Sequence, residues 1–322
     1  MAYVGSQEGS RRDRPRRLAR LRFRLLLICT LVAVAAGAAT WQLTAPRPAF
    51  ERPPPDLVPG NVERGRTVFF AGGCASCHAS PGQPDRLRLG GGFALASPYG
   101  TFRVPNISPD RQAGIGAWSV TDLANALLSG VSPDNAHYYP AFPYSSYTGM
   151  TLEDVRDLYA FLQSLEPVSE RSKPHELALP FRIRRFVGFW KLLFFRPRHV
   201  EDARAGQTVS DRGRYLVEVL GHCAECHSTH NAFGAVKPST RFAGGANVDG
   251  VGFVPNITPQ RLASWSVEDI AEMLKSGKTP DHGQIGWSMA DVVENTAELS
   301  QDDRLAIASY LKSLPPKDTP KP

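Results

Sequence analysis

The sequence contains the five-residue pattern C-x-x-C-H twice, from Cys74 to His78 and from Cys223 to His227. Two thiols separated by two residues lie on one turn of a helix, with the histidine directly beside them. Four of the five cysteines belong to these two motifs, so none is left for a framework of disulfides. The fold must therefore be built around two copies of one local thiol–imidazole site.

The sequence around the two motifs is also repeated. Equivalent segments are separated by 147 to 150 residues. The matching pairs are ERGRTVFFAGGCASCH (63–78) with DRGRYLVEVLGHCAECH (211–227), VPNISP (104–109) with VPNITP (254–259), AWSVTDLANALLSG (117–130) with SWSVEDIAEMLKSG (264–277), and FLQSLEP (161–167) with YLKSLPP (310–316). This pattern predicts two tandem domains, at residues 60–168 and 206–316.

Both repeats have a mainly helical outline, and the lack of sustained period-two alternation predicts few strands. Gly65 and Gly213 lie in the expected first helices, where a missing side chain permits close helix crossing, with Phe161 and Tyr310 of the last helices as expected partners. The middle and last helices are expected to begin at motifs resembling a capping box. These are Ser119-x-x-Asp122, Ser266-x-x-Asp269, Thr151-x-x-Asp154 and Ser300-x-x-Asp303.

The N-terminal region predicts a single membrane anchor. Eight arginines lie within residues 1–24, and an uncharged apolar run follows at 25–45. By the positive-inside rule, the arginine-rich end stays in the cytoplasm and the rest is exported. A cleaved signal peptide is the alternative, but the apolar run is longer than a typical signal core. We expect a single-pass protein of the bacterial inner membrane, with its domains in the periplasm.

Two connecting segments and a short tail (317–322) complete the expected organisation. Residues 46–59 are a proline-rich spacer, and residues 169–205 are a basic and aromatic connector between the repeats. Its part FRIRRFVGFWKLLFFRPR (181–198) is expected to be a strap that packs the domains together. Alternatively, this part lies on an anionic membrane surface or binds a protein partner.

Charges after residue 24 sum to zero, so the sequence offers no patch for nucleic acid.

Three chemistries can use C-x-x-C-H. A redox dithiol needs a surrounding βαβ pattern, which this sequence lacks, and a shared zinc site needs the two distant motifs to converge. Covalent haem needs only one motif, because the two thiols add to the porphyrin vinyl groups and the histidine binds iron. We therefore expect two haems c, held by Cys74, Cys77 and His78 and by Cys223, Cys226 and His227.

The sixth iron ligand is expected to be a methionine. Met150 and Met289 each follow the middle helix of a repeat in a turn-like setting, whereas Met273 lies at a core position of a helix. A thioether ligand at this position raises the reduction potential of the haem iron and closes the iron to substrates. His137 and His282 are the rival ligands, but we interpret both as solvated loop histidines.

The segments YYPAFPYSSYTGMTLEDVRDLYAFLQSL, VPNISP and MADVVENTAELSQDDRLAIASYLKSLPP add a family resemblance. Over roughly residues 60–316 the chain resembles the cytochrome c subunits of membrane-bound alcohol, aldehyde and gluconate-type dehydrogenases. The resemblance implies that Met150 and Met289 are axial ligands. It also implies a periplasmic electron carrier between a dehydrogenase and quinone or a terminal oxidase. Those subunits usually carry three haems, whereas this chain has two motifs.

We therefore expect two tandem class I cytochrome c-like domains that carry single electrons from a dehydrogenase or quinol toward a terminal oxidase or small redox protein. No catalytic acid, base or nucleophile is assigned. The alternatives are a haem enzyme of the peroxidase or thiosulfate dehydrogenase type, with one open iron site, and a subunit that docks a dehydrogenase at the membrane.

Overall fold

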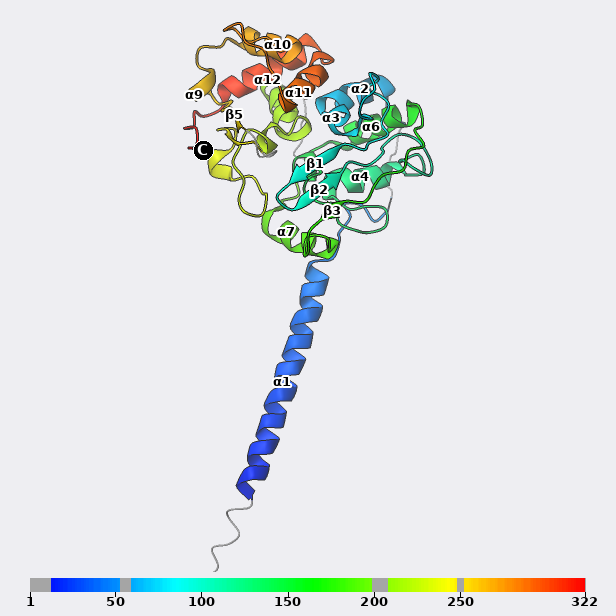
Figure 1. The fold of residues 1–322 in the computed structure, drawn as a ribbon, viewed down its shortest axis with the longest axis vertical. Coiled ribbons are helices and arrows are strands. Elements are labelled where there is room, and N and C mark those ends of the chain that lie inside the picture. Colours follow the sequence, from blue (N-terminus) through cyan, green and yellow to red (C-terminus); the bar gives the residue numbers. More distant parts are fainter. Residues whose placement is uncertain (1–12, 53–58, 199–207, 248–251, 322) are drawn as a thin grey trace, which may run out of the picture. The chain divides into compact units, whose positions relative to one another are not determined.

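The computed structural model describes residues 13–52, 59–198, 208–247 and 252–321 (Figure 1). The first twelve residues, part of the spacer (53–58) and the end of the connector (199–205) lie outside the described residues. The chain divides into two units, Met1–Ala45 and Pro46–Pro322.

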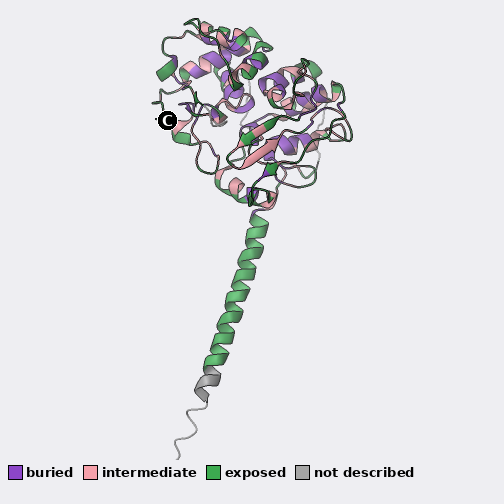
Figure 2. Ribbon diagram, viewed as in Figure 1, coloured by how far each residue is buried: buried purple, intermediate pink, exposed green. Residues whose placement is uncertain are grey.

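The first unit contains helix α1 (Asp13–Leu43). Its side chains are exposed along residues 18–43 (Figure 2). The segment Leu18–Leu43 is long and apolar enough to cross a membrane. Most of the expected anchor (25–45) therefore belongs to this single apolar helix.

The second unit is mainly helical. The first repeat contains α2 (Val62–Ala71), α3 (Cys74–His78), α4 (Val120–Ser129), α5 (Tyr144–Tyr147) and α6 (Leu152–Ser164). The connector contains η1 (Arg184–Phe186) and α7 (Val187–Phe194). The second repeat contains α8 (Val209–Tyr215), η3 (Leu216–Leu220), η4 (Cys223–Glu225), η5 (Pro238–Thr240), α9 (Pro259–Leu262), α10 (Val267–Ser276), α11 (Ser288–Ala297) and α12 (Gln301–Ser313).

Strands are short, as predicted, in the part of the chain that the structure describes. Strands β1 (Ala94–Ser97), β2 (Gly100–Arg103) and β3 (Glu176–Leu177) form an antiparallel sheet in that order. Strands β4 (Gly245–Ala246) and β5 (Phe253–Val254) form an antiparallel pair. The mainly helical fold class is confirmed.

The predicted helix starts are confirmed in both repeats. Ser119 and Ser266 form complete capping boxes, in which the serine side chain accepts from the N3 backbone and the N3 aspartate accepts from the serine backbone. Thr151 and Ser300 cap α6 and α12 through their hydroxyl oxygens. These bonds satisfy amide groups that the first turn of a helix leaves without a partner.

The close crossing of the first and last helices depends on glycine. A Cβ atom added to Gly65 would lie 1.9 Å from the Asp157 carbonyl oxygen and 2.8 Å from the Phe161 Cβ. A Cβ atom added to Gly213 would lie 2.8 Å from the Tyr310 Cβ. Both predicted pairs are therefore confirmed, and α2 crosses α6 as α8 crosses α12.

The two repeats share one cluster of buried residues. Phe69 and Leu162 of the first repeat and Leu216 and Ile270 of the second are nearly fully buried members of it. Residues 46–322 accordingly form one compact unit. The division into separate domains at 60–168 and 206–316 stays a prediction.

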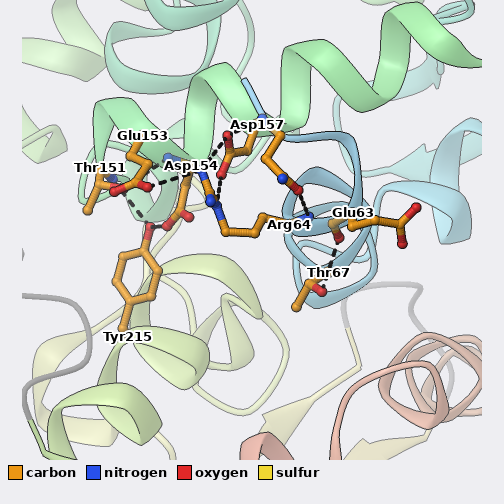
Figure 3. Close-up of polar contacts among 9 residues, drawn as sticks. Glu63, Arg64, Thr67, Thr151, Glu153, Asp154, Asp157 and Tyr215 are labelled. Atoms are coloured by element: carbon orange, nitrogen blue, oxygen red, sulfur yellow. Dashed lines mark hydrogen bonds and ion pairs between the residues drawn. The ribbon is translucent and has the colours of Figure 1, made fainter. Parts of the chain in front are cut away.

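Polar contacts join α8 to α6 across the repeats (Figure 3). The Tyr215 hydroxyl donates to the Asp154 carboxylate and accepts from the Thr151 backbone amide at 3.2 Å. Burial raises the pKa of Asp154, and the hydrogen bond from Tyr215 opposes this shift. Within the first repeat, Arg64 Nε donates to the buried Asp157 at 2.6 Å.

Helix α11 explains why the repeats differ in length near their ends. Met150 directly precedes the cap of α6, whereas ten residues lie between Met289 and the cap of α12. Most of those extra residues belong to α11, which packs against α2 and α3 of the first repeat. The Asn295 amide of α11 donates to the Ser76 hydroxyl, inside the first motif, at 2.7 Å.

The connector packs on both repeats, as the strap interpretation predicts. Lys191 Nζ donates to the Ser129 and Gly130 carbonyls, at 2.7 and 2.8 Å, where α4 ends. The Trp190 ring nitrogen donates to the Phe233 carbonyl of the second repeat at 2.9 Å. Burial lowers the pKa of Lys191 to about 7.

We predict that Gly213→Ala lowers the free energy of unfolding by about 1–3 kcal/mol, the usual cost of overpacking. The added methyl group would lie 2.1 Å from the Ala306 carbonyl oxygen and force α8 and α12 apart. Chemical denaturation followed by circular dichroism measures the loss. Gly286→Ala is the matched control, because no atom lies within 4 Å of its added Cβ. Equal stability of the two variants would contradict the crossing argument.

Candidate functional site

The first motif is a single helical turn that follows a glycine bend. Gly73 adopts φ 63°, and α3 begins at the next residue. This turn carries Cys74, Cys77 and His78 together, with Cys74 half-buried and Cys77 exposed. One turn thus presents two thiols and an imidazole, the arrangement that covalent haem attachment needs.

The His78 ring is fixed by a carbonyl. Its Nδ1 lies 2.8 Å from the Pro105 carbonyl oxygen, which can only accept a hydrogen bond, so Nδ1 carries the proton. The Nε2 lone pair is therefore available for a metal, the arrangement typical of metal-binding histidines. Burial lowers the pKa of His78, which favours the neutral imidazole that a metal requires.

The second motif has a similar arrangement, although its turn is a short 3-10 helix. His222 adopts φ 38° before η4, which begins at Cys223. His227 Nδ1 lies 2.7 Å from the Pro255 carbonyl oxygen. Burial also lowers the pKa of His227. Two independent segments of the chain thus prepare an imidazole in the same way.

The role of the proline carbonyls was missed by the sequence analysis. Pro105 and Pro255 belong to the repeated VPNISP and VPNITP segments, 27 and 28 residues after the histidine that each one orients. The next residue in each segment, Asn106 or Asn256, is buried and binds backbone carbonyls of a distant segment. The similar spacing after each histidine was the signal that could have indicated this role.

Met150 lies beside the first motif. It is 1% exposed and lines a small cavity together with Cys74. The remaining lining is apolar apart from one tyrosine: Val68, Gly72, Leu127, Tyr147, Leu158 and Leu220. Leu220 comes from the second repeat, so both repeats enclose this site.

The other candidate ligands lie in different surroundings. Met289 is partly buried in the first turn of α11 and packs against the core, as does Met273 within α10. His282 is exposed, as expected of a solvated loop histidine. His137 is 3% exposed, so its interpretation as solvated was wrong. Its carbonyl accepts a hydrogen bond from Arg184, at 2.9 Å, so the connector lies against this loop.

The two motif loops are neighbours in space. The Tyr147 hydroxyl donates to the Gly72 carbonyl, two residues before Cys74, at 2.7 Å. The same tyrosine ring packs edge-on against His222, directly before Cys223, with centroids 5.6 Å apart. A single side chain therefore contacts both loops.

The first thiol of each motif is not a ready nucleophile. Burial raises the pKa of Cys74 to about 12 and, in the second motif, the pKa of Cys223 to about 12. A reactive thiol pair needs a lowered pKa, because the thiolate is the nucleophile. Neutral thiols next to a neutral imidazole and an apolar cavity fit a covalently attached haem.

Comparisons with known proteins agree with this class of site. Residues 62–166 match the cytochrome c family. The diheme cytochrome c-type protein of Cereibacter sphaeroides is 49% identical over 290 residues, which are 88% of this chain and 96% of that protein. The fructose dehydrogenase cytochrome subunit of Gluconobacter japonicus is 36% identical over 301 residues, 89% of this chain and 58% of that subunit.

A third relative is the cytochrome c subunit of the quinone alcohol dehydrogenase of Gluconobacter oxydans, 35% identical over 303 residues, which are 88% of this chain and 58% of that subunit. The chain thus spans little more than half of both dehydrogenase subunits but nearly all of the Cereibacter relative. It belongs to the cytochrome c family, and its cofactor is haem c.

We predict that Tyr147→Phe lowers the free energy of unfolding by about 1 kcal/mol or slightly more, because the buried Gly72 carbonyl loses its hydroxyl donor. Guanidinium unfolding of the purified protein measures this change. Tyr144→Phe in the same helix is the control. Its buried hydroxyl has no hydrogen-bond partner among the described residues, so its removal is expected to be neutral or stabilising. A larger loss in Tyr144→Phe would refute the assignment.

Proposed function

We propose that this chain is a membrane-anchored dihaem c-type cytochrome that carries single electrons in the periplasm. The observation that carries the proposal is the duplicated turn, in which two thiols lie beside an imidazole held by a proline carbonyl. Haem c supplies one-electron exchange at its iron. The residues of this chain attach the haem, orient the axial imidazole and limit access of water.

Each repeat is proposed to hold one haem and so to form a tandem class I cytochrome c domain. The repeated caps and glycine crossings of the first and last helices support this organisation. The thioether links come from Cys74 and Cys77 and from Cys223 and Cys226, and the iron ligands are His78 with Met150 and His227 with Met289. The burial of Met150 beside Cys74 supports the first set.

The membrane and its orientation are proposed from α1. The helix satisfies the length and composition of a membrane span, and the arginines that precede the apolar run favour a cytoplasmic N-terminus. The haem-bearing unit then lies on the periplasmic side of the bacterial inner membrane. In that compartment covalent attachment protects the vicinal thiols from oxidation to disulfides.

A dehydrogenase or a quinol is the proposed electron donor. The relatives named as cytochrome subunits of fructose and alcohol dehydrogenases support a dehydrogenase. The proposed acceptor is a terminal oxidase or a small redox protein, because a methionine-bound iron has a raised potential and passes electrons onward.

The haem count tests the proposal directly. We expect the pyridine haemochrome assay to give two haems per chain, and the double variant Cys223→Ala/Cys226→Ala to give one. Cys29→Ser, which changes the cysteine of α1, is expected to keep both haems because that residue lies outside the motifs. A wild-type protein with one haem would remove the second site from the proposal.

The midpoint potentials and the absorption spectra of the haems test the methionine ligands. We expect Met150→Ala to abolish one ferric methionine charge-transfer signal and to lower one midpoint potential by on the order of 0.1–0.3 V, within the roughly 0.8 V range that axial ligands control. Met289→Ala is expected to do the same for the other haem.

Met273→Leu is the matched control, because this partly buried methionine packs in the core and should leave both spectra unchanged. A wild-type protein with one high-spin, open iron, unaffected by one of the two substitutions, would instead favour the alternative of a haem enzyme of the peroxidase or thiosulfate dehydrogenase type.

A further inference from the structure

The connector leaves an apolar surface uncovered. Ile183, Phe186, Phe189, Leu192 and Leu193 are 42–60% exposed. We call these five residues the α7 surface. Phe186, Phe189 and Leu193 follow each other at intervals of three and four, so they lie along one side of the helical segment. Exposed apolar side chains gathered in this way mark an interaction site.

The opposite side of α7 is held by the protein. Val187 and Gly188 are buried, and Lys191 binds the two carbonyls at the end of α4. The Trp190 ring packs edge-on against Tyr144, with centroids 6.3 Å apart. The helix is therefore fixed to the second unit, and its exposed apolar side chains cannot turn into the core.

The charge around the α7 surface is of one sign. Residues 177–198 contain six arginines and lysines and no aspartate or glutamate. Arg182 and Arg196 are exposed, one before the helix and one after it. Arg196 also donates to the carbonyls of Leu192 and Leu193, so its charge is held at the C-terminal end of α7. Apolar side chains flanked by arginines are typical of helices that lie in the interface of an anionic bilayer.

The attachment of the chain after α1 lies next to α7. The Ala49 amide donates to the Ser129 hydroxyl at 3.2 Å, and Lys191 of α7 binds the carbonyl of the same serine. Phe50 adds two hydrogen bonds to Asn125, at 2.8 and 3.0 Å. Ala49 lies only six positions after Leu43, the last residue of α1, a stretch that spans at most about 20 Å.

We propose that the α7 surface lies in the interface of the phospholipid bilayer in which α1 is anchored, with the connector arginines near anionic headgroups. The inference rests on the proposed membrane anchor. The bilayer is preferred to a protein partner because Ser129 ties α7 to the point where the chain arrives from the span. Two attachments, the span and the interfacial helix, fix the orientation of the haem-bearing unit toward the membrane.

Site-directed spin labelling of the full-length, haem-loaded protein tests this proposal. Leu193→Cys in a Cys29→Ser background is labelled and reconstituted in phosphatidylcholine–phosphatidylglycerol vesicles. Collision rates with oxygen and with a water-soluble nickel chelate are then measured. We expect the nickel collision rate of this label to lie several-fold below that of a label at Val292→Cys. Its oxygen collision rate is expected to lie above that of the Val292→Cys label. Val292 is 37% exposed on α11, at the opposite end of the unit from α7 (Figure 1).

A second label, at Leu192→Cys, repeats the measurement if the first variant loses haem. A nickel collision rate at the α7 surface equal to that at Val292 would overturn the proposal. Shielding that appears only after a dehydrogenase is added would also overturn it, because a protein would then be the occupant. Extraction by alkaline carbonate or absence of haem would instead refute the proposed function, so the two failures can be told apart.

Discussion

The hydrogen bond between a histidine ring and a proline carbonyl is the interaction on which both sites depend. It assigns the proton of His78 and of His227 to Nδ1 and leaves Nε2 available to bind iron. The carbonyl is itself fixed, because Asn106 ties the first proline segment to residues 168 and 170 through buried hydrogen bonds. Residues after the last helix of the repeat thus help to orient a ring near its beginning.

This constraint explains why the rest of each repeat is built as it is. The motif turn, the proline loop and the segment that holds this loop are separate in sequence, so the helices between them must meet at fixed distances. Gly65 and Gly213 permit that approach, and capped helix starts at Ser119 and Ser266 fix where the middle helices begin. The repeats then share one core, and Tyr147 links their motif loops.

Features with local signals could be predicted from the sequence: the helix caps, the glycine crossings, the motif turns and the apolar N-terminal helix. Features that depend on contacts between distant segments could not. Only the similar spacing of the two proline segments after each histidine hints that the Pro105 carbonyl meets His78, and no local pattern indicates that Arg184 of the connector binds the His137 carbonyl. The ten extra residues before α12 were visible as a length difference, but their packing on Ser76 was not. Ligation by Met150 and Met289 stays a prediction.

The duplicated sequence produces two sites in different surroundings. Around the first motif, Leu220 of the second repeat lines the cavity that holds Met150, and Asn295 of α11 binds the motif itself. Around the second, Met289 lies in the first turn of α11, next to the highly exposed Trp287. Solvent exposure and hydrogen bonding are among the properties by which a protein sets the potential of haem iron. The added helix therefore places two similar motifs in different surroundings, and the two proposed haems are expected to differ in reduction potential.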